Sequence, residues 1–360
     1  MENSLTMPHG SGTDRLRVLM VSNHSSLKTQ YPYAGIFVDR QIDSLQRAGI
    51  EVRSCDMDTI RSPIGLLKCW RQLHKVASEF QPDLVHAQYG SVVGFMAVLL
   101  GYPTVVSFCG HDLLSGAEMD GIRMRVGFLL SNLSALFAKA MICKSEELRQ
   151  ALWWRKDRAV VIPNGVDLEL FSPGQKGPAR EILQWDQHTP TVLLVIGSNP
   201  KRKGLDLANA AMDYVRRQIP AAKLHLIHDV QPNLMPQYYR AADVLLCASK
   251  REGSPNAVKE ALACNLPIVS VPVGDVGERL FGVSHSKIVS REPVAIGRAL
   301  IEILIAGKRS NGRDSMELLS IDRVGQRVCD VYRLAVSGTH EARSRATVQG
   351  STNPKSVAKM

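Results

Sequence analysis

Residues 251–270 read REGSPNAVKEALACNLPIVS, and they decide how the second half of the chain folds. The apolar run DVLLC at 243–247 indicates a buried strand just before them, so Glu252 lies in a loop at the carboxyl end of that strand. Pro255 suits the first position of a helix, and Asn256 opens its first turn. Because free N–H groups at such a helix start attract anionic or hydroxyl-rich ligands, the segment predicts a binding loop.

Two carboxylates frame this loop and helix. Glu260 falls about one to two turns inside the helix, so Glu252 and Glu260 could reach one elongated ligand at two points. Carboxylates accept hydrogen bonds from the vicinal hydroxyls of sugars, and Gly253 and Ser254 let backbone N–H groups point at the same ligand. The plainer alternatives are a solvated loop charge at Glu252 and an exposed helix charge at Glu260.

Short apolar runs alternate with helical patterns on both sides of this segment. Continuous runs of Val, Ile and Leu between amphipathic helices are typical of parallel sheets covered on both faces. The expected strands are 17–22, 50–55, 83–87, 104–108, 139–143, 159–162, 191–197, 223–228, 243–247 and 267–271. We therefore predict an α/β protein with two Rossmann-like, doubly wound parallel-sheet domains that face each other across a cleft.

A polar stretch rich in Pro and Gly interrupts the alternation once and sets the domain limits. The first domain spans 1–171, the linker 172–190 and the second domain 191–313. Residues 314–336 form a helix that could cross back to the first domain. Residues 337–360 are rich in Ser, Thr and basic residues and lack an apolar period, so we predict a disordered tail there.

The composition is that of an ordinary globular protein, with 45% hydrophobic and 22% charged residues among 360. Lys and Arg number 44 and Asp and Glu 34, and the net charge of +10 indicates anionic partners. The seven cysteines, an odd number without a CxxC pair, predict buried thiols in a reducing compartment. The Cys and His positions show no zinc spacing, and the polar start predicts no signal peptide.

Residues 88–110 carry no charged side chain and are long enough to span a membrane. Gly101, Tyr102 and Pro103 divide them into a helix and a β run at 104–108. A buried helix followed by a buried strand therefore explains the stretch better than a transmembrane helix does.

The 251–270 segment resembles the E-x7-E motif of retaining glycosyltransferases of the GT-B fold, family 4, which have two Rossmann-like domains. Other segments resemble the same family in the same order along the chain. They are Gly35 to Phe37 with Gln41, PDLVHAQ at 82–88, VIPNGVD at 161–167 and AADVLL at 241–246. The resemblance covers about residues 17–335.

The resemblance implies a role for each matching residue. Glu252 would be a catalytic residue beside the donor sugar, Glu260 would bond the nucleotide ribose, and Lys203 would neutralise the diphosphate, although a solvated basic turn is its plainer alternative. The first domain would bind the acceptor and the second a nucleotide sugar. The implied donor-binding residues are Gly35, Asn199, Arg202, Lys203, Gly253, Ser254, Pro255, Asn256 and Glu260.

One departure from the family pattern lies in the loop 197–204. Many family members have Arg directly after its glycine, where this chain has Ser198, so Lys201 or Arg202 could compensate. No Asp-x-Asp pair suited to a metal diphosphate occurs in the corresponding loop, and the DMD run at 56–58 is better explained as a solvated turn. We therefore expect a metal-independent protein with no cofactor.

A second departure concerns the histidine. The family often reads His-Gly-x-Asp after its fourth strand, where this chain has CGHD at 109–112. His111 is then the candidate general base, and Cys109 is interpreted as a packing residue, with the assignment between them left open. His86 ends another strand, so it could line the cleft or be a structural histidine.

The resemblance implies a retaining hexosyltransferase that moves a sugar from a nucleotide-diphosphate sugar to an acceptor, such as a lipid-linked or exopolysaccharide precursor. Front-face transfer and a covalent intermediate both stay open, as do the sugar, base, acceptor and linkage. The alternatives are a catalytically weak sugar-nucleotide-binding subunit and a nucleotide-sugar epimerase. A nicotinamide dehydrogenase is disfavoured because no GxGxxG follows the first strand, and nucleic acid because no recognition motif accompanies the charge.

Two segments could touch an anionic bilayer that bears a lipid-linked acceptor. The apolar helix at 121–137 begins with Arg123 and Arg125, and WWRK at 153–156 sets aromatic rings beside cations. A buried core helix and a packed helix end are the respective alternatives. We expect a cytoplasmic protein that could lie peripherally at the inner face of the cell membrane.

Overall fold

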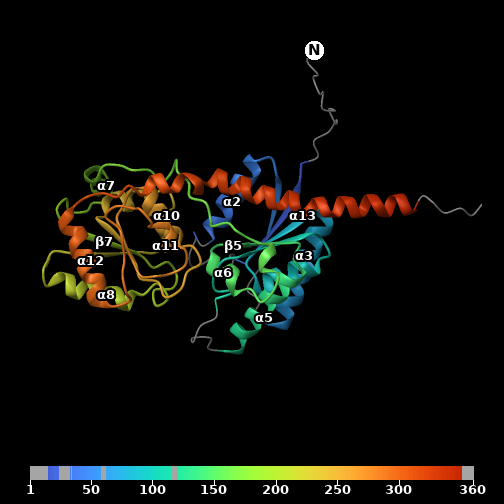
Figure 1. The fold of residues 1–360 in the computed structure, drawn as a ribbon, viewed down its shortest axis with the longest axis horizontal. Helices are drawn as coiled ribbons and strands as arrows, with labels where there is room; N and C mark the ends of the chain where they lie inside the picture. Colours follow the sequence, from blue (N-terminus) through green and yellow to red (C-terminus); the bar gives the residue numbers. More distant parts are fainter. Residues whose placement is uncertain (1–14, 24–32, 34, 58–61, 115–120, 351–360) are drawn as a thin grey trace, which may run out of the picture.

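Two parallel sheets, each in its own domain, form the protein (Figure 1). The computed structural model describes residues 15–23, 33, 35–57, 62–114 and 121–350, with side chains up to residue 337. The N-terminal sheet has the strand order β2-β1-β3-β4-β5-β6, and the C-terminal sheet has the order β11-β10-β9-β7-β8. All of these pairings are parallel, which confirms the two predicted doubly wound domains.

The N-terminal domain places helices between consecutive strands. Its strands are β1 (Arg17–Ser22), β2 (Glu51–Asp56), β3 (Leu84–Gln88), β4 (Thr104–Phe108), β5 (Ala140–Cys143) and β6 (Ala159–Val161). Its helices are α2 (Ile36–Arg47), α3 (Pro63–Phe80), α4 (Ser91–Leu99), α5 (Ile122–Phe137), α6 (Glu146–Ala151) and the 3-10 helix η1 (Lys156–Arg158). The order reverses at β1, which pairs with β2 on one side and β3 on the other.

The C-terminal domain repeats this arrangement around β7. Its strands are β7 (Thr191–Val195), β8 (Lys223–Ile227), β9 (Val244–Cys247), β10 (Ile268–Ser270) and β11 (Lys287–Ile288). Its helices are α7 (Lys176–Ile182), α8 (Leu205–Arg216), α9 (Met235–Ala241), α10 (Asn256–Ala263), α11 (Val276–Arg279), α12 (Pro293–Ala306) and the 3-10 helix η2 (Gly312–Leu319). The last helix, α13 (Ile321–Gly350), leaves this domain.

The apolar runs form strands because helices cover both faces of each sheet. Every residue of β3, β4 and β9 is buried. Along β7, Val192 and Leu194 belong to the core cluster that holds α8 and α12, whereas Leu193 belongs to the cluster that holds α10. This alternation of side chains between two apolar layers is what a continuous run of apolar residues requires.

The uncharged stretch 88–110 folds as predicted, into the short helix α4 and the buried strand β4. Within the part of the chain that the structure describes, no helix combines the length and the apolar character needed to cross a bilayer.

Helix α13 passes from the C-terminal domain onto the N-terminal one and packs beside α2 (Figure 1). Its Tyr332 Oη lies 2.5 Å from Nδ1 of His86 on β3. Just before α13, Val166 and Ser320 pair as an isolated β-bridge. The two passages of the chain between the domains therefore lie side by side.

The predicted linker 172–190 is corrected, because its helix α7 packs on α9 of the C-terminal domain. Arg180 of α7 is fully buried. Its guanidinium donates to the backbone oxygen of Ala241 at 3.0 Å and pairs with Asp243 at 2.9 Å. A buried guanidinium that satisfies its donors in this way fixes the segment to the domain.

The predicted disordered tail is corrected as well, because α13 continues through residues 337–350. The packed turns before residue 337 already supply the helix nucleus, so extension by Ala, Glu, Arg and Gln needs no new nucleation. The remaining part of the predicted tail, 351–360, lies outside the described residues.

Candidate functional site

A cavity of about 460 Å³ lies between the two domains, where strands of both sheets end. We call it the donor cavity, after the donor-binding residues that the sequence predicts there. The first turn of α2 lines it from the N-terminal domain, and the loops after β7 and β8 and the start of α10 line it from the other. Open α/β sheets bind ligands at this position. The predicted site residues that line it are Gly35, Arg202, Lys203, Glu252, Ser254, Pro255, Asn256 and Glu260.

Three predicted site residues do not line the donor cavity. Asn199 and His111 line a neighbouring cavity of about 340 Å³. Gly253 faces the N-terminal domain, where a Cβ would lie 2.8 Å from both the backbone oxygen of Cys109 and Cδ1 of Leu148. Gly253 therefore permits the close approach of the two domains at the site.

Glu252 forms an ion pair inside the cleft. Its Oε1 lies 2.6 Å from Nζ of Lys203 and 3.5 Å from Nη1 of Arg202. Burial raises the pKa of Glu252, but the two cations outweigh burial and hold the pKa below its ordinary value. Glu252 is therefore a carboxylate at neutral pH, with a cation beside it.

The loop that carries Lys203 is built on close backbone contacts. Gly204 has a φ of +77°, and a Cβ at this position would lie 2.1 Å from the backbone oxygen of Ala248. The Asn199 side chain accepts a hydrogen bond from the backbone N–H of Arg202 at 2.9 Å. Asn199, predicted to bind the donor, thus shapes the loop in this structure.

Glu260 joins the two domains at the donor cavity. Its Oε1 accepts a hydrogen bond from Nη1 of Arg40 on α2 at 3.0 Å, and its Oε2 accepts one from the hydroxyl of Tyr239 at 2.9 Å. Sequence reasoning missed both partners. Arg40 stands 220 positions from Glu260, and Tyr239 lies in an ordinary helix, so neither carries a local signal.

A buried lysine lies behind the loop that carries Ser254. Nζ of Lys259 donates to Oγ of Ser254 and to the backbone oxygen of Asn164, each at 2.9 Å. Oγ of Ser254 donates in turn to Asp275 at 2.8 Å, and burial lowers the pKa of Lys259 to about 7. Lys259 thus connects the loop that carries Ser254 to Asn164, which lies just before the chain passes between the domains. Sequence reasoning missed this role, because a lysine in a helix ordinarily points to solvent.

The CGHD loop after β4 is held by Asp112. Its carboxylate accepts backbone N–H groups of Gly90, Cys109 and Gly110 at 2.7–3.1 Å. Burial raises the pKa of Cys109 to about 12, so its thiol stays protonated. Burial and then Arg202 lower the pKa of His111, which leaves a neutral imidazole at neutral pH. These states suit His111 better than Cys109 as the predicted base.

His86 is a structural residue, the second of its two predicted alternatives. It is fully buried, and its ring nitrogens lie 2.8 Å from Oγ of Ser107 and 2.5 Å from the hydroxyl of Tyr332. Burial lowers the pKa of His86 to about 3, so the ring is neutral.

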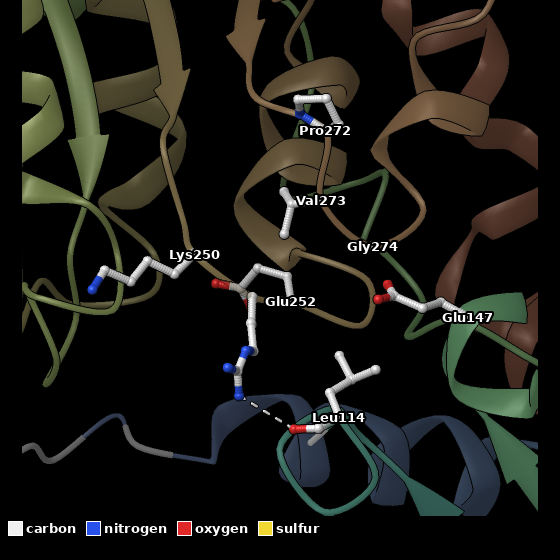
Figure 2. A pocket seen from close by; sticks show the side chains of 8 residues that line it. Leu114, Glu147, Lys250, Glu252, Pro272, Val273 and Gly274 are labelled. Carbon is white, nitrogen blue, oxygen red and sulfur yellow. Dashed lines mark hydrogen bonds between the residues drawn. The ribbon is translucent and has the colours of Figure 1, made fainter. Parts of the chain in front are cut away.

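A third, smaller cavity of about 240 Å³ lies beside Glu252 (Figure 2). Leu114 and Glu147 line it from the N-terminal domain, and Lys250 lines it from the C-terminal domain. Figure 2 shows Glu147 and Lys250 on opposite sides of Glu252. The dashed line in Figure 2 is the hydrogen bond that Nη1 of Arg251 donates to the backbone oxygen of Leu114 at 3.4 Å.

No group of three His, Cys, Asp or Glu side chains in the described ranges is placed to hold a metal ion. Asp56 accepts a hydrogen bond from Oγ of Ser22 at 3.1 Å, and Asp58 lies outside the described residues. Metal independence stays a prediction.

Two family models match the chain, one in each domain. The model described as Glycosyltransferase Family 4 matches residues 34–170, and the model described as Glycosyl transferases group 1 matches residues 179–306. Together they cover well over half of the chain.

Curated relatives that match the chain in sequence are named as glycosyltransferases. The D-inositol 3-phosphate glycosyltransferase of Segniliparus rotundus is 29% identical over 53% of this chain and 51% of its own length. The UDP-Gal:alpha-D-GlcNAc-diphosphoundecaprenol alpha-1,3-galactosyltransferase of Escherichia coli is 27% identical over 61% of this chain and 66% of its own length. The chain thus spans about half the length of several curated relatives that it matches.

Solved structures share the fold over most of the chain. Sucrose-phosphate synthase of Thermosynechococcus elongatus superposes with a TM-score of 0.72 at 19% identity, over 90% of this chain and all of that one. The Anabaena protein HepE, in complex with UDP and glucose, superposes with a TM-score of 0.69 at 16% identity, over 89% of this chain and all of that one. From the two domain matches and the common fold, we conclude that the chain belongs to glycosyltransferase family 4.

Proposed function

We propose that this protein is a retaining glycosyltransferase that takes a sugar from a nucleotide-diphosphate sugar. The Lys203–Glu252 ion pair carries the proposal, because it holds a cation and an ionised carboxylate together in the donor cavity. The start of α10 lines the same cavity, and the first backbone N–H groups of a helix suit a phosphate. HepE, which shares the fold, has been solved with UDP and glucose, in line with a donor of this kind.

In the proposed reaction, the bond between the anomeric carbon and the phosphate oxygen breaks, and its electron pair leaves with the diphosphate. Lys203 and the start of α10 would stabilise that charge. Glu252 would stabilise the oxocarbenium-like state, by analogy with carboxylates of hydrolases. The acceptor hydroxyl would attack from the same face, with His111 as the candidate to take its proton. This chemistry needs no metal, so we expect full activity in EDTA.

The acceptor is proposed to be a lipid-linked or polysaccharide precursor. The relative from Escherichia coli is named for a diphosphoundecaprenol acceptor. A relative from Bacillus subtilis, 24% identical over 77% of this chain and 85% of its own length, is named for teichuronic acid biosynthesis. A lipid-linked acceptor requires a protein that can work close to a membrane.

Helix α5 offers a surface for that contact, and we propose that it binds an anionic bilayer. Ile122 is 78% exposed and Phe137 63% exposed, and the nearby Trp153 is 52% exposed. Arg123 and Arg125 lie in the first turn of the helix and are exposed. Apolar side chains flanked by cations suit the headgroup region of anionic lipid. Co-sedimentation should show binding to anionic vesicles and none to neutral ones, and equal binding to both would contradict the charge argument.

The donor site is tested by thermal shift with nucleoside diphosphates and sugar nucleotides. A ligand at 100 times its dissociation constant adds about 2.7 kcal/mol to stability. We expect one diphosphate to raise the melting temperature of the wild type, with the shift lost in Glu260→Ala and kept in Glu317→Ala, an exposed carboxylate on η2. If no nucleotide shifts the folded wild type, the proposed donor site is wrong. A second assay measures the release of nucleoside diphosphate with and without an acceptor. A transferase releases it only when the acceptor is present, which distinguishes it from an epimerase.

A further inference from the structure

The 340 Å³ cavity next to the donor cavity is lined by positive charge. In the part of the chain that the structure describes, its lining residues are His111, Met124, Asn199, Lys201, Arg202, Lys250 and Arg251. Four of these seven are Lys or Arg, and none is Asp or Glu. Cations gathered at a concave surface focus the potential and attract anions. The cavity therefore suits an anionic ligand.

Three of the four cations that line the 340 Å³ cavity do not line the donor cavity. Lys203 and Arg202 line the donor cavity, whereas Lys201, Lys250 and Arg251 do not. A diphosphate at Lys203 would therefore leave at least Lys201 and Arg251 to a second anion. Arg251 donates its one described hydrogen bond to a neutral carbonyl, so that contact does not cancel its charge.

The loops that carry the cations are fixed before any ligand arrives. The backbone N–H of Lys250 donates to the backbone oxygen of Arg202 at 2.9 Å and so joins the two loops. Asn199 accepts the backbone N–H of Arg202 within the first loop, and Arg251 reaches the backbone of Leu114 across the cleft. Fixing the loops in advance removes part of the ordering cost of binding an anion.

The cavity also lies where an acceptor has to enter. His111, the candidate base, lines it, so a hydroxyl next to the bound anion would come close to the imidazole. Met124 lines it from α5, and the exposed apolar residues Ile122, Val126 and Leu129 lie on the same helix. An anion in the cavity with an apolar tail would therefore find α5 beside it.

We propose that this cavity binds the phosphate or diphosphate group of a phosphorylated acceptor, and we call it the acceptor-anion pocket. The inference rests on the proposed function and adds where the acceptor is anchored and by which chemical group. A soluble sugar phosphate and a lipid-linked sugar diphosphate share this chemistry, and the experiment separates them.

The first experiment titrates inorganic pyrophosphate into protein that is saturated with UDP. UDP fills the donor cavity, so the pyrophosphate that binds reports on the acceptor-anion pocket. In Lys201→Ala/Arg251→Ala we expect the affinity for pyrophosphate to fall about tenfold or more, with the affinity for UDP unchanged. The control is Lys308→Ala, an exposed lysine that lines neither cavity. Melting temperature and circular dichroism verify that each variant folds, and Arg251→Lys should retain most of the affinity.

Two results would overturn the inference. UDP-saturated wild type that binds no pyrophosphate has no such pocket. A double variant that loses UDP affinity would assign these cations to the donor diphosphate instead. UDP, GDP and ADP, each titrated alone into the wild type, test the proposed function separately, since failure of all three to bind removes the donor site itself.

A second experiment identifies the source of the phosphate. Transfer is measured to a soluble sugar phosphate and to the same sugar on a polyprenyl diphosphate in anionic vesicles. With the acceptor that works, the double variant should raise the acceptor KM about tenfold and leave the donor KM unchanged. An unchanged acceptor KM in both arms contradicts the inference.

Discussion

At the scale of single residues, burial and neighbouring charges decide which ionisable side chains keep their charge. Glu252 keeps its charge because Lys203 and Arg202 outweigh its burial. His86 loses its charge because it is fully buried between two hydroxyl groups. The first residue can act on a ligand, whereas the second one holds the fold.

Glu252→Gln is expected to lower kcat roughly a hundredfold or more, because it removes the charge that would stabilise the transition state. The amide keeps the size of the side chain, so the protein should fold and bind UDP nearly as the wild type does. Steady-state kinetics together with a UDP titration check this. A variant with normal kcat would rule out the catalytic role.

His86 should make the protein sensitive to acid. Its pKa is about 3 in the fold and about 6.5 in the unfolded chain, so the unfolded state binds an extra proton between these values. The free energy of unfolding therefore falls as pH decreases from about 6.5 towards 3, by up to about 1.4 kcal/mol per pH unit.

Urea titrations at several pH values should show a shallower fall for His86→Gln, which keeps polar atoms but does not titrate. The exposed His188→Gln serves as the control and should follow the wild type. If His86→Gln also follows the wild type, His86 is not the source of the pH dependence.

At the scale of elements, helix α13 packs closely against α2 at Gly325. A Cβ on Gly325 would lie 2.1 Å from Oγ of Ser44, whose hydroxyl donates to the backbone oxygen of Ile321 at 3.0 Å. Further along α13, Tyr332 is buried and packs on His86 of β3. The small residue sets how closely the two helices approach.

Gly325→Ala is expected to destabilise the protein by about 1–3 kcal/mol, because the added methyl group overpacks this contact. Ser44→Ala removes the clashing atom, so the double variant should recover part of the loss. Denaturant unfolding measures both. Gly277→Ala on α11, where a Cβ meets nothing within 4 Å, is the control. Equal stability of Gly325→Ala and the wild type would contradict the packing argument.

The elements most readable from the sequence are those whose signal is local. Runs such as VLLV at 192–195 on β7 are apolar throughout because both faces are covered, and the loop of Glu252 follows shortly after the end of β9. The burial of Arg180 could not be predicted, because a charged residue in a polar stretch is ordinarily exposed to solvent. Its partners Ala241 and Asp243 are more than 60 positions away. The pairing of Arg40 with Glu260 depends on how two domains meet, which no local pattern contains.

At the scale of the whole molecule, the ion pair of Arg40 and Glu260 spans the cleft between the domains. Both side chains are largely buried, at 17% and 15% exposure, so solvent screens the pair less than a surface pair. The pair therefore favours a closed arrangement of the domains.

Arg40→Met should shift the ligand-free protein towards a more open form, because the unpaired carboxylate of Glu260 is more stable when it is hydrated. Small-angle scattering should report a larger radius of gyration for this variant. Arg47→Met, which breaks the exposed pair with Asp322, should leave the radius unchanged. An unchanged radius in Arg40→Met would show that the pair does not hold the cleft.

The β-bridge between Val166 and Ser320 makes the C-terminal domain an insertion within the N-terminal one. The chain enters and leaves that domain at neighbouring points, so a short turn from Val166 to Ser320 could replace everything between them and keep Tyr332 in its place. A cut before Ile321, in contrast, would strip α13 from the core of the N-terminal half. The C-terminal domains of two proteins with this fold could accordingly be exchanged as units, provided that both junctions are moved together.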